Sequence, residues 1–95
     1  MGKMVVYLSG PITGVEGYRE AFDKAESELK ATGYIVLNPA KLPEGMTKEQ
    51  YMQINLAQID AADVVWFLHG WQNSEGAKLE HSYCEYIGKA VIEDD

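Results

Sequence analysis

The chain has 95 residues, enough for one domain with a hydrophobic core and too few for a second. Its net charge is −7 and its lysines and arginines are scattered, which argues against binding a nucleic-acid backbone or an anionic membrane surface. The one cysteine, Cys84, cannot form an intramolecular disulfide, and no apolar run approaches the roughly 20 residues that span a bilayer or resembles a signal peptide. We therefore expect a single cytoplasmic domain over residues 1–95.

The first half of the chain predicts a strand, a helix and a second strand. Residues 4–8 form an apolar run that ends at Gly10, which is typical of a buried strand followed by a loop. From Tyr18 onward the apolar residues recur at helical spacing, up to a stop at Gly33. Residues 34–37 form the second short strand. The crossover between the two strands is expected to be right-handed.

The second half continues this alternation after a loop at residues 40–46. Thr47 and Gln50 match a capping box, which predicts a helix over residues 48–61. The remaining elements are expected as a strand at 63–68, a helix at 75–88 and a strand at 89–92. Strands that alternate with helices predict an α/β fold with helices on both faces of a parallel sheet. We expect a three-layer, doubly wound, Rossmann- or flavodoxin-like sheet of four strands in the order 2-1-3-4.

Two features of the helix over residues 75–88 can be predicted from its sequence. Ser74 is a plausible N-cap, because its side chain can accept a hydrogen bond from the first turn. The core face of this helix is expected to consist of its larger apolar residues, namely Leu79, Tyr83, Tyr86 and Ile87. Trp66, in the preceding strand, is also expected in the core.

The loop after the strand at residues 63–68 is expected to form one wall of a ligand site. In open α/β sheets, ligands bind outside the carboxyl ends of the strands, beside helix N-termini. Glu80 lies in the following helix, and it is either a solvated helix glutamate or a partly buried nucleophile or general base. Ser74 and Gly76 either cap the helix or hold a phosphate with the free N–H groups of its first turn.

Other candidate residues remain open at this level. The loop at residues 9–14 is neither a P-loop nor a dinucleotide fingerprint. Tyr7 points either into the core or toward the site, and Trp71 is a candidate to stack on a base. His81 and Cys84 share a helical face, but two ligands do not make a zinc site. We expect no metal and no cofactor.

Three segments, at residues 7–14, 62–65 and 74–80, together resemble the nucleoside 2-deoxyribosyltransferase superfamily. The Ser-x-Gly-x-x-x-Glu pattern from Ser74 to Glu80 is most similar to the 2′-deoxynucleoside 5′-phosphate N-hydrolase branch, and the whole chain resembles small phage and prophage relatives. The resemblance implies that Glu80 is the nucleophile, that Tyr7 orients it, and that Ser74 and Gly76 hold the 5′-phosphate. It assigns the first sugar and base loop to Ser9, Gly10, Ile12 and Gly14.

The chain departs from this pattern at Asn55, where the family usually has an aspartate that handles the leaving base. Asparagine can hydrogen-bond a base but cannot deliver a proton. We therefore expect either cleavage or transfer at the N-glycosidic bond of a 2′-deoxynucleoside or its 5′-monophosphate, with Asn55 and Trp71 at the base, or a nucleotide-binding protein with little or no activity. A third reading is a small dimeric scaffold that binds a protein partner.

A homodimer or higher homo-oligomer is also expected. So short a chain buries a modest share of its surface, and association would add to that share. The resemblance implies that neighbouring subunits complete the site. Members of that superfamily also continue past the fourth strand, whereas this sequence ends at Asp95, so we expect either that a partner chain closes the sheet or that the site is open and catalytically poor.

Overall fold

A four-stranded parallel sheet forms the centre of the protein. The structure is a computed structural model that describes residues 2–94. The strands are β1 (Val5–Ser9), β2 (Ile35–Leu37), β3 (Val64–Phe67) and β4 (Ala90–Glu93). They lie in the order β2-β1-β3-β4 and every neighbouring pair is parallel. The expected α/β architecture and strand order are therefore confirmed.

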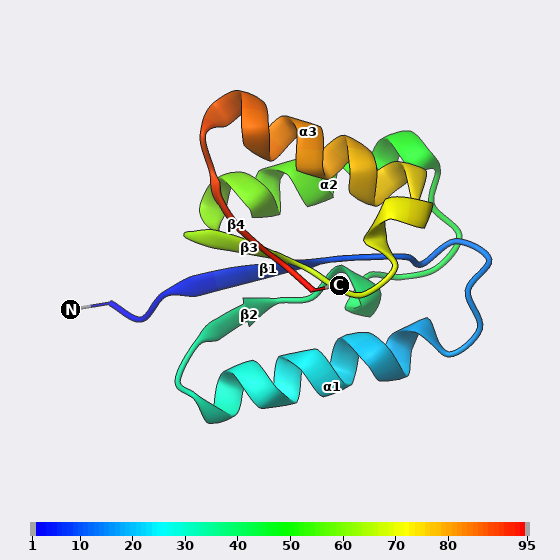
Figure 1. Cartoon of the computed structure of the whole chain (residues 1–95). Coiled ribbons are helices and arrows are strands. Elements are labelled where there is room, and N and C mark those ends of the chain that lie inside the picture. The colour runs from blue at the N-terminus through cyan, green and yellow to red at the C-terminus, as the bar shows by residue number, and fades with distance from the viewer. Residues whose placement is uncertain (1, 95) are drawn as a thin grey trace.

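Helices cover both faces of this sheet (Figure 1). The three α-helices are α1 (Tyr18–Ala31), α2 (Lys48–Ala61) and α3 (Glu75–Ile87). Helix α1 lies alone on one face, and α2 and α3 lie together on the other. Two short 3₁₀ turns, η1 (Pro39–Lys41) and η2 (Trp71–Asn73), follow β2 and β3. Among residues 2–94, no helix combines the length and hydrophobicity needed to cross a membrane.

Local sequence signals located the helix boundaries closely. Helix α2 has the predicted bounds, and the Thr47 side chain and Gln50 form both bonds of the capping box. Helix α3 begins after Ser74, whose Oγ accepts a hydrogen bond from the backbone N–H of Ala77. Strands β1 and β4 lie one residue later than predicted, and β2 and β3 are shorter by one and two residues, because pairing with neighbours rather than composition decides where a strand ends.

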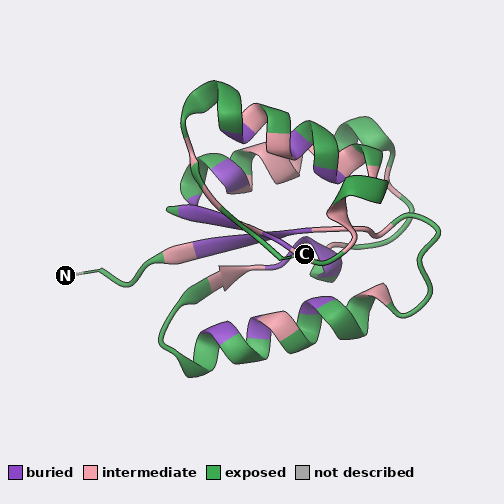
Figure 2. Ribbon diagram, viewed as in Figure 1, coloured by how far each residue is buried: buried purple, intermediate pink, exposed green. Residues whose placement is uncertain are grey.

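The core consists of one apolar layer on each side of the sheet, and the two layers alternate along β1. Val6 and Leu8 point toward α1 and pack with Phe22. Tyr7 points toward α2 and α3 and packs in the cluster that contains Phe67. Figure 2 shows this burial concentrated in the inner strands and the sheet-facing sides of the helices. Trp66, expected in the core, is only half-buried and packs at the edge of the layer beneath α1.

The predicted core face of α3 is wrong for Leu79, Tyr86 and Ile87, which are exposed, whereas Tyr83 is half-buried and packs against the core. The residues that α3 buries are Ala77, Glu80 and Cys84. Leu79 is 50% exposed and Tyr86 is 90% exposed. Periodicity alone favours the side with the larger apolar residues, but packing against the sheet turned the helix so that a glutamate faces inward. Such a rotation is tolerated only if the buried carboxylate finds hydrogen-bond donors.

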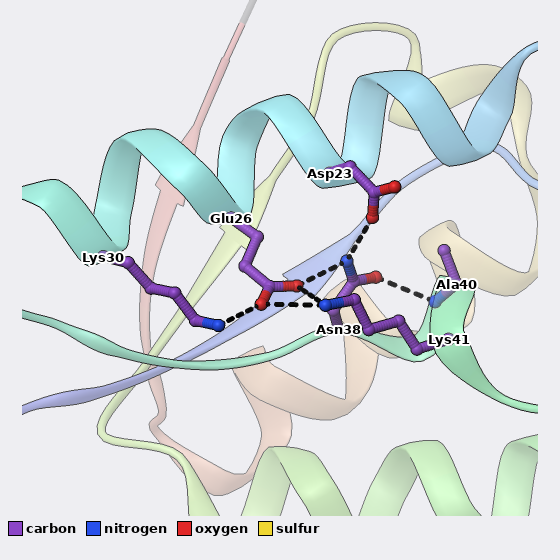
Figure 3. A network of polar contacts seen from close by, with 6 residues as sticks. All are labelled: Asp23, Glu26, Lys30, Asn38, Ala40 and Lys41. Carbon is purple, nitrogen blue, oxygen red and sulfur yellow. Dashed lines mark hydrogen bonds and ion pairs between the residues drawn. The ribbon is translucent and has the colours of Figure 1, made fainter.

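A second buried glutamate fixes α1 to the turn that follows β2 (Figure 3). Glu26 accepts a hydrogen bond from Asn38 Nδ2 at 2.9 Å and pairs with Lys30 at 2.6 Å and Lys41 at 3.0 Å. Asn38 Oδ1 in turn accepts from the N–H of Ala40, which caps η1. Burial opposes ionisation of Glu26, but these three donors outweigh it and lower its pKa to about 2. The network therefore holds the carboxyl end of β2 in place.

Candidate functional site

Glu80 is the centre of a buried polar cluster beneath α2 and α3. The residue is 4% exposed. Its Oε1 accepts two hydrogen bonds, from Ser9 Oγ at 2.8 Å and from Tyr7 Oη at 3.1 Å. Its Oε2 accepts one, from Asn55 Nδ2 at 3.2 Å. Three side chains, two from β1 and one from α2, thus converge on the one carboxylate that α3 carries.

The fold explains why these side chains meet. Tyr7 and Ser9 alternate with Leu8 on β1, so both point to the face of the sheet that α2 and α3 cover. Asn55 lies in the middle of α2, and Glu80 lies between one and two turns into α3. Both helices begin at the carboxyl end of the parallel sheet. The cluster therefore lies just below the edge where ligands bind in open α/β folds.

Burial is the main influence on the ionisation of this cluster. Loss of hydration raises the pKa of Glu80, and the hydrogen bonds from Ser9, Tyr7 and Asn55 lower it in part, with a net increase. Burial also raises the pKa of Tyr7 well above its usual value, and the neighbouring carboxylate adds to this increase. Tyr7 is therefore a hydrogen-bond donor that holds Glu80, and it does not exchange protons at neutral pH.

Acceptor capacity is left on both Asn55 and Glu80. A carboxylate offers about four lone-pair positions, two on each oxygen. Both positions on Oε1 are used, whereas Oε2 has one to spare. Asn55 Oδ1 is buried and has no hydrogen-bond partner among the described residues. A ligand that entered here would meet one free carboxylate position and one unpaired amide oxygen.

The first turn of α3 leaves space directly above Glu80. Gly76 is one helical turn before Glu80, on the same side of the helix. A Cβ built at Gly76 would have Ser74 Oγ, at 4.0 Å, as its nearest neighbour. The N–H of Ala77 donates to Ser74 Oγ, and the N–H of Lys78 donates to the backbone oxygen of Ser74. The N–H groups of the two preceding residues of the helix stay available to an anion.

Trp71 is held by protein contacts in the structure. Its indole stacks on the imidazole of His81, with ring centroids 4.4 Å apart and planes 15° apart, and packs obliquely on Phe67. His81 Nε2 is hydrogen-bonded to Glu93 Oε2 at 2.8 Å. Trp71 Nε1 is buried without a hydrogen-bond partner among the described residues. That His81 holds Trp71 in place was not predicted, and nothing in the sequence pattern indicated it.

The loop after β1 lies beside the cluster, and its assignment to the sugar and base stays a prediction. Ile12 packs against the apolar layer on the α1 side. Gly10 is in close contact with the core, since an added Cβ would lie 3.1 Å from Leu68 Cβ. Gly14 adopts a left-handed turn with φ of 73° in open space. Of the predicted loop residues, Ser9 is the one whose side chain hydrogen-bonds Glu80.

His81 and Cys84 do not form a shared site. Cys84 is fully buried against the sheet, whereas His81 bonds Glu93 at the end of β4. Burial and the nearby Glu80 raise the pKa of Cys84 to about 11, which keeps the thiol protonated. Among residues 2–94, no group of three His, Cys, Asp or Glu side chains is arranged to hold a metal ion.

Comparison with known proteins gives a family without an assigned activity. No curated protein matches the sequence. Residues 4–93, nearly the whole chain, match a family described as a domain of unknown function, DUF4406. The Glu80 cluster and all four strands lie within the matched range. The chain therefore belongs to the DUF4406 family.

Proposed function

We propose that the protein cleaves or transfers at the N-glycosidic bond of a 2′-deoxynucleoside or its 5′-monophosphate, with Glu80 as the nucleophile. The observation that carries the proposal is the buried Glu80 carboxylate, held by Ser9, Tyr7 and Asn55 with one lone-pair position free on Oε2. A fixed, dehydrated carboxylate is suited to attack an electrophilic carbon. The resemblance described above selects the anomeric carbon as that electrophile.

The reaction is written in two steps. In the first, a lone pair of Glu80 Oε2 forms a bond to the anomeric carbon, the bond from this carbon to the base nitrogen breaks, and its electron pair leaves with the base. In the second, water or the nitrogen of another base attacks the same carbon, and the bond to Glu80 breaks to restore the carboxylate. The proton released by the attacking group neutralises the departed base.

Two features of the site agree with the proposed substrate class. Oε1 already accepts two hydrogen bonds, so a sugar 2′-hydroxyl directed at it would lack an acceptor, which favours deoxyribose. The open space at Gly76 and the free N–H groups at the start of α3 suit a 5′-phosphate. A phosphate bound there needs no basic side chain, in keeping with the acidic composition of the chain.

The alternative is a nucleotide-binding protein with little or no turnover, and Asn55 is the observation that favours it. The partners of Glu80 are a serine, a tyrosine and an asparagine, and none of them is an acid at neutral pH. A departing base would receive no proton from them. Bases that are already good leaving groups would then be cleaved fastest.

The test is incubation with each deoxynucleoside and its 5′-monophosphate, followed by chromatography of the free base and intact mass spectrometry of the quenched protein. Glu80→Gln should abolish base release and retain ligand binding, and Glu20→Gln, on the exposed side of α1, serves as the matched control. A deoxyribosyl adduct on the wild type that is absent from Glu80→Gln supports the nucleophile. Binding without base release by the wild type supports the alternative, and absence of binding refutes both.

A further inference from the structure

One face of the sheet is covered by fewer helices than the other. Neighbouring strands lie about 4.8 Å apart and a helix is about 10 Å wide, so one helix covers roughly two strands. Helices α2 and α3 together cover one face of the four strands, whereas α1 lies alone on the opposite face (Figure 1). Because α1 connects β1 to β2, its face of the sheet is left open on the side of β3 and β4.

Side chains along β3 and β4 show this opening. Val65 and Phe67, which point toward α2 and α3, are both 0% exposed, whereas Trp66 between them points to the α1 face and is only half-buried. Ile92 is the neighbour of Trp66 in the register of β3 and β4, so it lies on the same face, and it is 45% exposed. In Figure 2, β4 is coloured intermediate or exposed along its length. An apolar part of the sheet therefore meets solvent.

A groove with a volume of about 370 Å³ lies between α1 and this open part of the sheet. Its apolar lining includes Trp66 and Leu68 from the sheet side and Leu29 from α1. The charged residues that line it are Glu28 of α1 and Asp94, which directly follows β4. Both carboxylates are exposed, and neither has an ion-pair partner within residues 2–94. The groove is thus apolar inside and negative at its edges.

We propose that this groove binds a basic amphipathic helix of a partner protein. The apolar side of such a helix would cover Trp66 and Ile92, and lysine or arginine beside that side would pair with Glu28 and Asp94. A second copy of this chain suits the groove less, because it carries a charge of −7 and its basic residues are scattered. The cluster around Glu80 lies on the other face of the sheet, so the partner would leave it uncovered.

The first test measures binding of a fluorescein-labelled model helix of about four turns, with leucine on one side and lysine beside it. A second peptide has glutamate in place of lysine. By fluorescence anisotropy, the full chain should bind the lysine peptide at least about tenfold more tightly than the glutamate peptide, because the groove has negative edges. Absence of binding, or equal binding of both peptides, overturns the proposal.

Matched substitutions locate the contact on the protein. Ile92→Lys should weaken binding of the lysine peptide by about tenfold or more, since it places a charge under the apolar side of the helix. Leu79→Lys is the control, because Leu79 is 50% exposed but belongs to α3, on the opposite face. Glu28→Lys should also weaken binding, and Glu85→Lys, again on α3, should weaken it much less. Each pair changes the net charge equally, so equal effects within a pair would indicate general attraction and would contradict the groove.

Two further measurements test other surfaces and another occupant. Addition of the lysine peptide to isotope-labelled protein should change the amide chemical shifts of Ala25, Trp66 and Ile92 and leave that of Glu80 unchanged. Changes centred on α3 would overturn the proposal. Sedimentation equilibrium tests whether a second copy covers the groove, since a dimer that Ile92→Lys converts to the monomer of 10.6 kDa would also overturn it. Circular dichroism checks that every variant is folded.

Discussion

Replacement of Glu80 by glutamine should change how the stability of the protein depends on pH. The substitution keeps the size of the side chain and an acceptor at Oε1 for Ser9 and Tyr7. Its amide nitrogen takes the place of Oε2, which accepts from Asn55 Nδ2 in the wild type, so the Asn55 amide has to turn over and present Oδ1, which then accepts from the new N–H. The main difference is thus the removal of one ionisable group from the interior.

The sign follows from the raised pKa of Glu80 in the folded state. In the unfolded chain a glutamate has a pKa of about 4.3. Between this value and the higher folded-state pKa, the folded protein binds more protons than the unfolded one, so the free energy of unfolding falls as pH rises. For one proton the slope is at most about 1.4 kcal/mol per pH unit. Below pH 4 the effect of Glu80 vanishes, and above the folded-state pKa it is constant.

The assay is urea denaturation of the wild type and Glu80→Gln at a series of pH values from 3.5 to 8, followed by far-ultraviolet circular dichroism. Because the two proteins share all other titrating groups, the contributions of these groups cancel when one free energy of unfolding is subtracted from the other. Relative to the wild type, Glu80→Gln should gain stability as pH rises above about 4.3. A flat difference, or one that falls with pH, would refute the argument that burial dominates the ionisation of Glu80.

Three further predictions concern single side chains. Glu26→Gln should lower the free energy of unfolding by up to about 3 kcal/mol at pH 7, because the pKa of Glu26 is lowered to about 2 in the folded protein. This stabilisation is present above pH 4.5 and is lost as pH falls toward 2, so urea denaturation at pH 7 and at pH 3 measures it. Ser9→Ala removes a bond that lowers the pKa of Glu80, so the pH–rate profile should move to higher pH while Glu80→Gln stays inactive. Gly76→Ala should keep the melting temperature but weaken nucleotide binding. Gly10→Ala should instead lower the melting temperature, because its Cβ would lie 3.1 Å from Leu68 Cβ in the core. Calorimetry without ligand and thermal shift with a nucleotide distinguish the two effects.

Local signals singled out Glu80 as a candidate, whereas the roles of Tyr7, Ser9 and Asn55 came from the family resemblance. Glu80 follows a capped helix start, and Ser9 ends an apolar strand, so the parallel fold brings both to one edge of the sheet. The placement of Ile12 against the layer on the α1 side could not be predicted, since a loop without regular pairing can turn its side chains to either face of the sheet. The stacking of Trp71 on His81 likewise depends on where η2 meets α3.

The sequence by itself determined the elements and their order. Caps such as Thr47 and Ser74 act within a few residues, and alternation of strands and helices leaves few topologies for a parallel sheet. Only the tertiary structure decided how α3 is rotated about its axis. Its periodicity favoured a core face around Leu79 and Tyr86, but the buried face includes Glu80, because donors from β1 and α2 satisfy that carboxylate. Such donors lie 25 to 73 residues away in the chain, so no local pattern can reveal them.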